Sequence, residues 1–234
     1  MELQDYCVID LEMTGLNPQT DQVIEVGAAR VRGGKVVATM GELCACKRPL
    51  PDRIVELTGI TDAMLAGKRD VDAVLADFLA FIVEDVIVGH NLSFDYRFLK
   101  QWCINKKEKL SLKSVDTLKI ARALLPGEQS KKLEDLCNYF GIKRENAHRA
   151  LDDVLETVEV MERLKELGEE KPELFEAKEL QIKMKRQTPA TGHQIERLKE
   201  YREKHGLTDE IWWDTLTRSE ASRLYDKYIA TYGK

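Results

Sequence analysis

The sequence Val8-Ile9-Asp10-Leu11-Glu12-Met13-Thr14-Gly15 begins as an apolar run typical of a buried strand and then places two acids two residues apart. In a strand this spacing sends the carboxylates of Asp10 and Glu12 to the same face. Two like charges repel there and resist burial, unless a cation lies between them. Hard oxygen ligands of this kind suit Mg²⁺ or Mn²⁺. The simpler alternative is that the strand ends at Asp10 and water solvates both acids.

The pattern around this strand predicts an α/β domain with a mixed sheet and helices packed on it. Residues 23–31 form a second apolar run, and Gly33-Gly34 predicts a hairpin turn into a third strand at 35–47. Beyond them, short strands alternate with segments of helical periodicity. The expected strands are 86–89 and 114–117, and the expected helices are 71–82, 91–99, 118–125, 133–140 and 151–167.

The chain divides into three parts by composition. Residues 1–168 contain the strand and helix pattern, and we expect them to form one domain. Residues 169–187 are charged with few apolar anchors, which we interpret as a linker helix. The turn signal at 188–192 then opens a small helical module, residues 188–234, with helical patterns at 193–205 and 219–232.

Charge and cysteine content limit the classes of function. The formal net charge of the 234 residues is −5, so a protein of this balance that acts on nucleic acid must use local basic patches or bound metal. The five cysteines are scattered without zinc spacing, which indicates reduced thiols. The N-terminus lacks a basic signal-peptide region and no apolar run has transmembrane length, so we expect a cytoplasmic protein that does not enter a membrane.

Two further groups of polar residues follow the first. In Gly89-His90-Asn91-Leu92-Ser93-Phe94-Asp95, Asn91 suits a helix N-cap, and Asp95 lies four residues later on the same helix face. In His148-Arg149-Ala150-Leu151-Asp152-Asp153, a continuous helix would set His148 and Asp153 about 140° apart. Both residues can therefore serve one site only if the helix starts after His148.

The three groups together resemble the DEDDh 3′–5′ exonucleases, and most of all the group that contains the epsilon proofreading subunit of bacterial DNA polymerase III. The resemblance covers roughly residues 5 to 165, and the order and separation of the motifs are those of the family. Supporting matches are Ile24-Glu25-Val26-Gly27, Leu57-Thr58-Gly59-Ile60-Thr61, and Asp116-Thr117-Leu118 with Ala121-Arg122.

The resemblance implies a ribonuclease H-like fold, a mixed sheet flanked by helices, and hydrolysis of the 3′-terminal phosphodiester to release nucleoside 5′-monophosphates. Its four acids match Asp10, Glu12, Asp95 and Asp153, which would hold two divalent ions, Mg²⁺ or Mn²⁺. Asp152 is the alternative acid of the third motif, but the family spacing favours Asp153. The family histidine matches His148; an imidazole, with its ordinary pKa of about 6.5, suits the removal of a proton from the attacking water.

Several residues are candidates for contacts with the substrate, and each has a structural alternative. Thr14 and Gly15 offer contacts to the terminal nucleotide or form a plain turn. Leu57 and Ile60 resemble family positions that wedge against the terminal bases, with ordinary packing as the alternative. The remaining candidates in this region are Asn91, and Phe94 as either a stacking or a core residue, whereas His90 and Asp116 are interpreted as structural.

The partners implied are the 3′ ends of single-stranded DNA or RNA, and a polymerase or other DNA-metabolism protein bound through the C-terminal module. That module has a helix start at Thr217 or Ser219, and its aromatic side chains either stack on bases or form its core. The competing hypothesis is a protein of the same fold that has lost catalysis and only binds nucleic acid or a polymerase. The complete set of four acids with His148 favours the enzyme.

Overall fold

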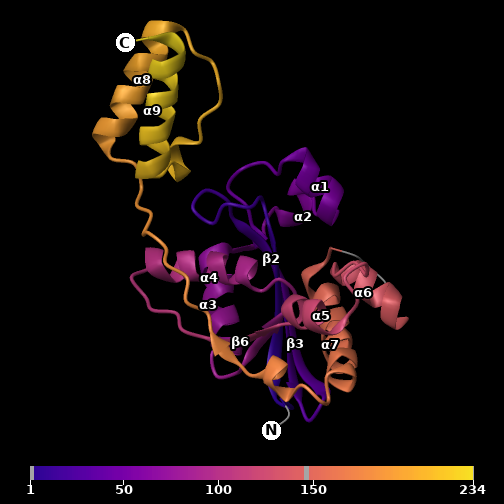
Figure 1. The fold of residues 1–234 in the computed structure, drawn as a ribbon. Helices are drawn as coiled ribbons and strands as arrows, with labels where there is room; N and C mark the ends of the chain where they lie inside the picture. Colours follow the sequence, from indigo (N-terminus) through magenta and orange to yellow (C-terminus); the bar gives the residue numbers. More distant parts are fainter. Residues whose placement is uncertain (1–2, 145–147, 234) are drawn as a thin grey trace.

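A mixed sheet runs through the larger part of the molecule, with its strands in the order β4-β3-β2-β1-β5-β6-β7 (Figure 1). The structure is a computed structural model that describes residues 3–144 and 148–233. The strands are β1 (Tyr6–Met13), β2 (Val23–Arg32), β3 (Lys35–Ala45), β4 (Arg69–Asp70), β5 (Ile87–Gly89), β6 (Lys113–Asp116) and β7 (Lys178–Glu179).

The first three strands form an antiparallel meander, as the sequence predicts. β1 pairs with β2, β2 pairs with β3, and Gly33 and Gly34 form the tight turn between β2 and β3 with φ of 56° and 74°. Both angles lie in the left-handed region that glycine enters without steric cost. β5 then adds to β1 in parallel, and β6 to β5, so that the carboxyl ends of β1 and β5 lie at one edge of the sheet.

Helices cover both faces of the sheet (Figure 1). On one face, α3 (Val71–Ile82) and α4 (Ser93–Asn105) bury apolar side chains with Ile9, Leu11 and Val26. On the other face, α5 (Thr117–Leu124), α6 (Leu133–Phe140) and α7 (Ala150–Leu167) pack on Val8 and Ala29. The short helices α1 (Asp52–Thr58) and α2 (Asp62–Leu65) form a third apolar cluster at the end of the sheet.

The connection between α7 and the C-terminal helices is not the linker helix that the sequence analysis expected. Residues 169–187 contain a 3₁₀ turn, Pro172–Phe175, and the strand β7, which pairs antiparallel with β6. Leu180 and Ile182 pack against the same cluster as α4. Their separation by two residues is that of an extended chain, and burial on the sheet domain outweighs a helix of marginal intrinsic stability.

The C-terminal helices α8 (Gly192–His205) and α9 (Arg218–Tyr232) pack on each other and stand apart from the sheet (Figure 1). Each begins with a capping box, from Thr191 to Gln194 and from Thr217 to Glu220. Their shared core includes Leu198, Tyr201, Leu216, Ala221 and Tyr228. Most of the module's tyrosines therefore have a packing role.

The structure differs from the secondary-structure expectations at the linker described above, at the unpredicted short strand β4, and at α4, which continues to Asn105 beyond the expected end at 99. Asn91 is also not a helix N-cap: α4 starts at Ser93, Leu92 is the cap residue, and Asn91 has φ of 63°. Asparagine tolerates this left-handed conformation better than most residues. The role of Asn91 is therefore to turn the backbone between β5 and α4, not to cap the helix with its side chain.

The cysteines are free: Cys7, Cys44, Cys103 and Cys137 are buried and Cys46 is half-buried. This agrees with the expectation of reduced thiols. Within the described residues, no helix combines the length and the apolar character that crossing a membrane requires.

The packing of α7 on β2 depends on a glycine. A Cβ atom built on Gly27 would lie 2.4 Å from the backbone carbonyl of Ala150. We expect Gly27→Ala to lower the free energy of unfolding by about 1–3 kcal/mol, because a backbone contact has to move apart to admit the methyl group. Thermal or urea denaturation measures this effect.

Gly127 is the matched control, because a Cβ atom there meets no other atom within 4 Å. Gly127→Ala should leave stability nearly unchanged or raise it slightly. Equal stability of the two variants would show that α7 and β2 adjust to the added group without strain.

Candidate active site

The acids of the first motif lie on β1, as the sequence predicts, and strand alternation separates them from the apolar core. Leu11 and Met13 are buried, whereas Asp10 and Glu12 are each partly exposed on the other face. In the antiparallel pairing with β2, Asp10 lies opposite Gly27 and Glu12 lies opposite Glu25. The strand thus continues through both acids, and the alternative in which it ends at Asp10 is wrong.

Asp95 reaches the same strand end from the first turn of α4. Its Oδ1 accepts a hydrogen bond of 3.1 Å from the backbone N–H of Leu11, which lies between Asp10 and Glu12. The side chain is 5% exposed. The first turn of a helix also attracts negative charge, and the bond to the strand fixes the direction of the carboxylate.

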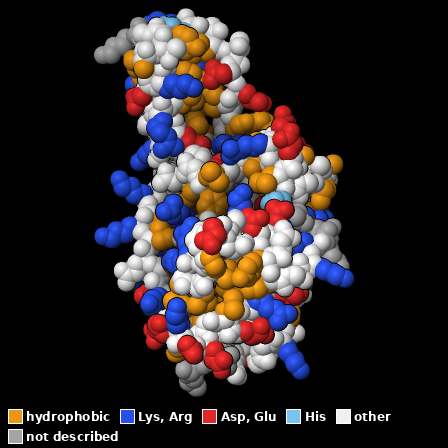
Figure 2. Space-filling model, turned by 45° about the vertical axis from the view of Figure 1, so that its right-hand side comes forward, with side chains coloured by type: hydrophobic (Ala, Val, Ile, Leu, Met, Phe, Trp, Pro, Cys, Tyr) orange, Lys and Arg blue, Asp and Glu red, His pale blue; other side chains and the backbone are white. Residues whose placement is uncertain are grey.

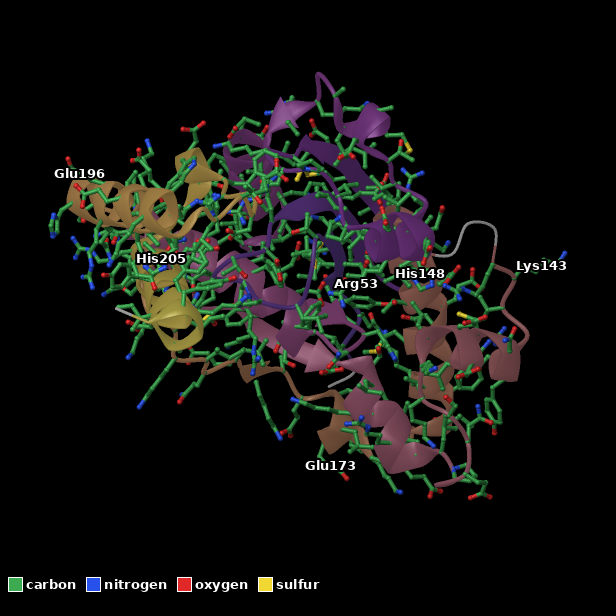
Figure 3. The ribbon with its side chains drawn as sticks, turned by 90° about the horizontal axis from the view of Figure 1, so that it is seen from above. Arg53, Lys143, His148, Glu173, Glu196 and His205 are labelled. Carbon is green, nitrogen blue, oxygen red and sulfur yellow. The ribbon has the colours of Figure 1, made fainter. Side chains whose placement is uncertain are left out.

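Asp153 and His148 come to the site from the start of α7. The helix begins at Ala150, so His148 lies in the turn before it and Asp153 in its first turn, as the spacing argument requires (Figure 3). One ligand atom each of Glu12, His148 and Asp153 lies within 4.8 Å of the others. His148 has φ of 62°, an unusual conformation that surrounding structure must hold in place.

Burial and mutual repulsion raise the pKa values of all four acids. Desolvation raises the pKa of Glu12 to about 8, with further contributions from the charges of Asp153, Glu25 and Asp95. Burial raises the pKa of Asp95 to about 7 and raises that of Asp153. The pKa of Asp10 also rises well above its usual range, because desolvation of its carboxyl group and the charges of Asp95, Glu12 and Asp153 disfavour its ionised form.

The four acids differ in their positive partners. Within residues 3–144 and 148–233, Asp10, Glu12 and Asp95 form no ion pair. Asp153 has a partner that the sequence analysis missed: Arg144 bonds to Asp153 Oδ1 at 2.9 Å and to Glu156 Oε2 at 2.7 Å. Arg144 lies in the connection between α6 and α7, a region without helical or strand periodicity to mark it. Its guanidinium lowers the pKa of Asp153, although burial has the larger, opposite effect.

A second positive contact, also missed, fixes the start of α7. Glu25 is 4% exposed, and its carboxylate accepts bonds from Arg149 (Nη2 at 2.7 Å) and from the backbone N–H of Ala150 at 3.0 Å. Glu25 therefore holds the two residues that follow His148. In the sequence, Glu25 stands out as an acid inside the apolar run 23–31 and as part of the family match Ile24-Glu25-Val26-Gly27, but neither signal shows that it binds the start of α7.

The structure gives Thr14 and Gly15 a clear role in the turn that follows β1. Thr14 Oγ1 accepts a hydrogen bond of 2.9 Å from the backbone N–H of Gln22. Gly15 is buried, and a Cβ atom there would lie 2.4 Å from the carboxylate of Asp21. Thr14 is partly exposed next to the acids and remains a candidate for a substrate contact. At position 15, the close approach of Asp21 leaves room only for glycine.

The candidates Leu57 and Ile60 are in different environments. Leu57, on α1, is 52% exposed, whereas Ile60 is 0% exposed in the cluster with Ile24 and Leu65. The expectation that Ile60 touches the terminal bases is not met in this conformation, because its whole side chain packs in the core. Leu57 is the member of the pair that is available to a ligand.

The second motif contributes one exposed and one half-buried candidate. Asn91 is exposed, and its backbone N–H bonds to Asp116 Oδ1, which also caps α5 through Leu118 N–H. Phe94 is half-buried and packs edge to face on Phe98. His90 bonds Thr117 and the carbonyl of Lys131, so the structural interpretations of His90 and Asp116 agree with their contacts.

The donor set suits a divalent cation. Carboxylates from β1, α4 and α7 converge at one strand end, and the repulsion that raises their pKa values is relieved by a positive ion. The four carboxylates supply the oxygen ligands that hard divalent cations prefer. Such an arrangement is typical of sites that bind and hydrolyse phosphate esters.

Comparison with known proteins identifies the family. Residues 7–161 match the exonuclease family RNase_T, and the chain belongs to this family. It is 40% identical over 164 residues to the PolC-type DNA polymerase III of Thermotoga maritima, and 36% identical over 156 residues to the DNA polymerase III epsilon subunit of Aquifex aeolicus. The first match covers 69% of this chain but 12% of the polymerase; the second covers 66% of this chain and 77% of the subunit.

Solved structures confirm the ribonuclease H-like fold that the resemblance implied. Escherichia coli exonuclease I, in complex with a dT13 oligonucleotide, superimposes with a TM-score of 0.61 at 22% identity. The superposition covers 74% of this chain and 42% of exonuclease I. The chain is thus a member of the exonuclease family with an α/β fold.

The raised pKa values predict how the stability of the metal-free protein depends on pH. A carboxyl group whose pKa is higher in the folded than in the unfolded protein contributes to the free energy of unfolding in its protonated form. This contribution is complete at a pH below the pKa of the unfolded protein and is lost as the pH rises through the pKa of the folded protein. For Glu12 this window runs from about 4.5 to about 8. In EDTA, the melting temperature should therefore fall between pH 5 and pH 9.

Glu12→Gln keeps the shape and removes the charge, so its melting temperature should fall less steeply over the same range. Adding Mg²⁺ or Mn²⁺ at pH 8 should raise the melting temperature of the unmodified protein more than that of the variant. Parallel pH curves for the two proteins, measured by differential scanning fluorimetry, would contradict the repulsion among the acids.

Proposed function

We propose that the protein is a 3′–5′ exonuclease that hydrolyses the last phosphodiester bond of a single strand and releases nucleoside 5′-monophosphates. The observation that carries the proposal is the convergence of Glu12, His148 and Asp153, with donor atoms within 4.8 Å of one another, at the strand end that also bears Asp10. Membership of the exonuclease family supports the reaction class.

In this proposal Asp10, Glu12, Asp95 and Asp153 hold two divalent ions, Mg²⁺ or Mn²⁺. Bound there, the ions would supply positive charge to the attacking and leaving oxygens of a substrate that is already anionic. The contribution of the chain is to bring the four carboxylates together from β1, α4 and α7 and to fix their directions, as the bond from Leu11 N–H does for Asp95. Arg144 has to release Asp153 Oδ1, or share it with a cation.

His148 acts as the general base that takes the proton of the attacking water on a ring nitrogen. It is half-buried, stands before α7 and lies beside Glu12 and Asp153, where a base must stand to act on water next to the acids. The positive charge that the ring then carries is balanced by these carboxylates. Glu25 places His148 indirectly, because it fixes Arg149 and Ala150.

The names of the relatives support DNA as the substrate. Both curated relatives are DNA polymerase III proteins, and the exonuclease I structure contains a dT13 oligonucleotide. We therefore propose the 3′ ends of single-stranded DNA as the first substrate to test, with short RNA as the second. In the same proposal, residues 1–168 are the catalytic domain, and the helical module at 188–234 is the part that would bind a polymerase or another DNA-metabolism protein.

The central experiment follows a single-stranded 20-mer labelled at either end, with Mg²⁺ or Mn²⁺. We expect a 5′-labelled strand to shorten one nucleotide at a time and a 3′-labelled strand to release labelled mononucleotide first. Asp10→Asn and Asp153→Asn should each abolish most turnover, because each removes a charged ligand from the site.

The matched control is Asp152→Asn, which removes the alternative acid one residue before Asp153 and should leave turnover nearly unchanged. EDTA should stop the unmodified enzyme. Full activity of Asp10→Asn and Asp153→Asn together with indifference to EDTA would rule out the metal-dependent mechanism, and release of internal fragments would rule out an exonuclease.

The role of His148 has its own test. His148→Ala should bind metal and nucleotide but turn over about 10²–10⁴-fold more slowly, which is the usual contribution of a positioned acid–base group. The acidic limb of the pH–rate profile should change as well. His193→Ala, at the exposed start of α8, is the control and should behave like the unmodified enzyme. Near-normal turnover of His148→Ala at pH 7 would exclude His148 as the base.

A further inference from the structure

A cleft of about 620 Å³ lies between the sheet domain and the helical module. It begins at Thr14, two residues after Glu12, and ends at residues 214–217 of the module. Its walls include the end of α4 and the extended segment that leads to α8. Figure 2 shows Lys and Arg side chains along the waist between the two parts of the molecule, although the chain as a whole is acidic.

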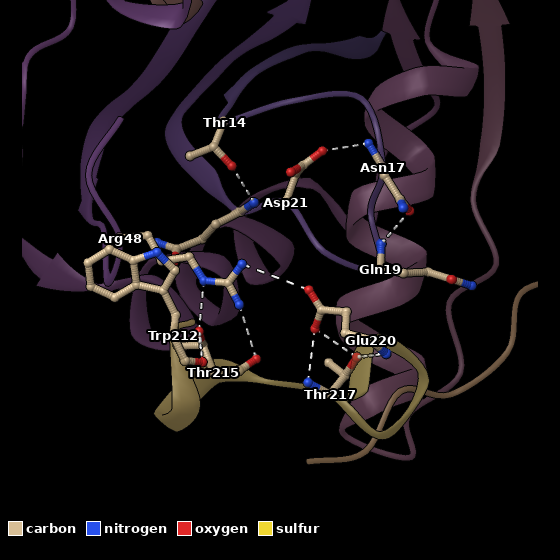
Figure 4. A network of polar contacts seen from close by, with 10 residues as sticks. Thr14, Asn17, Gln19, Asp21, Arg48, Trp212, Thr215, Thr217 and Glu220 are labelled. Atoms are coloured by element: carbon tan, nitrogen blue, oxygen red, sulfur yellow. Dashed lines mark hydrogen bonds and ion pairs between the residues drawn. The ribbon is translucent and has the colours of Figure 1, made fainter. Parts of the chain in front are cut away.

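The module is fastened to the sheet domain by a set of polar contacts (Figure 4). Arg48 donates to Thr215 Oγ1 at 2.7 Å and to the carbonyl of Thr215 at 3.3 Å, and its guanidinium lies 3.8 Å from Glu220. These contacts involve backbone as well as side chains on the module side. The cleft is therefore bounded by two bodies whose positions are linked.

The other wall, residues 185–187, is tied to α4 on both sides of Arg186. Gln101 Nε2 donates to the carbonyl of Lys185 at 3.1 Å, and the N–H of Gln187 donates to Asn105 Oδ1 at 2.8 Å. Gln187 is buried, whereas Arg186 is exposed. The contacts thus hold the backbone at the cleft and leave the guanidinium of Arg186 directed to solvent.

The cations of the cleft fall into two groups. Arg48 and Lys106 pair with Glu220 and Asp72, so their charges are largely balanced within the protein. Lys47 and Arg186 are exposed cleft residues that form no ion pair among the described residues. Lys47 lies close enough to Asp72 for its charge to lower the pKa of that carboxyl, but among the described residues neither Lys47 nor Arg186 is held in an ion pair, so both charges are available to a chain of phosphates.

Helix α4 connects the acids to this cleft. Asp95 stands in its first turn at the acids, and Trp102 and Lys106 line the cleft. From Asp95 to Trp102 is seven residues and to Lys106 eleven, or about 10 and 16 Å along a helix. At 3.4 Å per nucleotide of a stacked strand, this distance corresponds to roughly three to five nucleotides.

Trp102 adds an aromatic ring to the cleft wall. It is half-buried in the cleft wall, and Lys106 Nζ lies 5.7 Å from the centre of its ring. An aromatic ring next to positive charge is the combination that proteins use to bind single strands without sequence preference, since bases stack on the ring while cations follow the phosphates.

We propose that this cleft binds the single strand on the 5′ side of the scissile bond, through phosphate contacts with Lys47 and Arg186. The proposal rests on the proposed exonuclease function, because it assumes that the 3′ end of the same strand lies at the acids. A strand of two nucleotides is too short to extend from the acids to Trp102 and Lys106. Strands longer than about five nucleotides use both the acids and the cleft.

The test compares the double variant Lys47→Ala/Arg186→Ala with the unmodified full-length chain. Binding of a fluorescein-labelled 20-nucleotide single strand is measured by anisotropy in EDTA between 50 and 200 mM salt. Two lost phosphate contacts should make the slope of log K against log salt shallower by about 1.4, so the salt effect over this range shrinks about sevenfold. In hydrolysis with Mg²⁺, KM should rise for the 20-mer but not for a dinucleotide.

The control is Lys171→Ala/Lys204→Ala, which removes the same charge from two exposed positions outside the cleft. Its slope and KM should match those of the unmodified chain. An equal effect of the two double variants, or no effect of either, would overturn the proposal, because binding would then not depend on the cleft. A duplex of equal length that competes as well as the single strand would also overturn it.

The two proposals can fail separately. Turnover of the dinucleotide reports on the acids and His148 alone, whereas anisotropy in EDTA reports on the strand without catalysis. Salt-dependent binding that is lost in Lys47→Ala/Arg186→Ala, combined with no dinucleotide turnover, would retain the cleft and reject the exonuclease function. The reverse combination would retain the function and reject the cleft.

Discussion

The carboxylate of Glu25 is the contact on which the geometry of the site depends. It binds the N–H of Ala150 and the guanidinium of Arg149, and thereby fixes the first residues of α7 to β2. Asp153 is in the first turn of that helix, and His148 lies two residues before its first residue. Gly27 makes the same junction possible, because any side chain there would meet the backbone of Ala150. One buried acid and one glycine on β2 therefore set where two candidate catalytic groups stand.

This junction holds together groups that repel one another. Asp10, Glu12, Asp95 and Asp153 reach one strand end from three elements, and their pKa values rise because burial and like charge disfavour their ionised forms. Hydrophobic packing on both faces of the sheet supplies the stability that this repulsion opposes. The Arg144 guanidinium relieves the repulsion at Asp153 only. For Asp10, Glu12 and Asp95, the repulsion has to be relieved by a bound cation, by protonation or by solvation.

Much of the fold follows from local signals in the sequence, because each element has a clear period and clear ends. The hairpin at Gly33-Gly34, the amphipathic period of 71–82 and the stop at Gly141 all correspond to observed elements. The segment 169–187 is extended where its composition predicts a helix, because composition does not show that the segment is buried against the sheet domain. That burial is what makes an extended edge strand favourable. The spacing of Leu180 and Ile182 was the local signal for it.

The residues of the candidate site could be predicted where their spacing in the sequence indicates a shared face or a shared site. They could not be predicted where their role depends on contacts between residues distant in sequence. The two-residue separation of Asp10 and Glu12 can be read directly from the sequence, and a helix start after His148 follows as the condition for His148 and Asp153 to share one site. The contacts of Glu25 and Arg144 with residues of α7 cannot be read from it, since only the fold creates them. Ile60 and Leu57 show the same limit: both are apolar residues of one motif, and only packing decides that one is buried and the other exposed.

In the proposed function, an acidic protein binds a polyanionic substrate. The positions of its charges allow this, although its net charge does not. The net charge of −5 includes four carboxylates gathered at one strand end, which a divalent cation converts from a repulsive into an attractive feature for phosphate. The exposed cations at Lys47 and Arg186 lie in the cleft that begins at Thr14 and includes the end of α4 in its wall. In the proposed function each group of charges would act on its own part of a strand. The acids and their cations would set the chemistry at the 3′ end, while the basic cleft would set how strongly the rest of the strand is held.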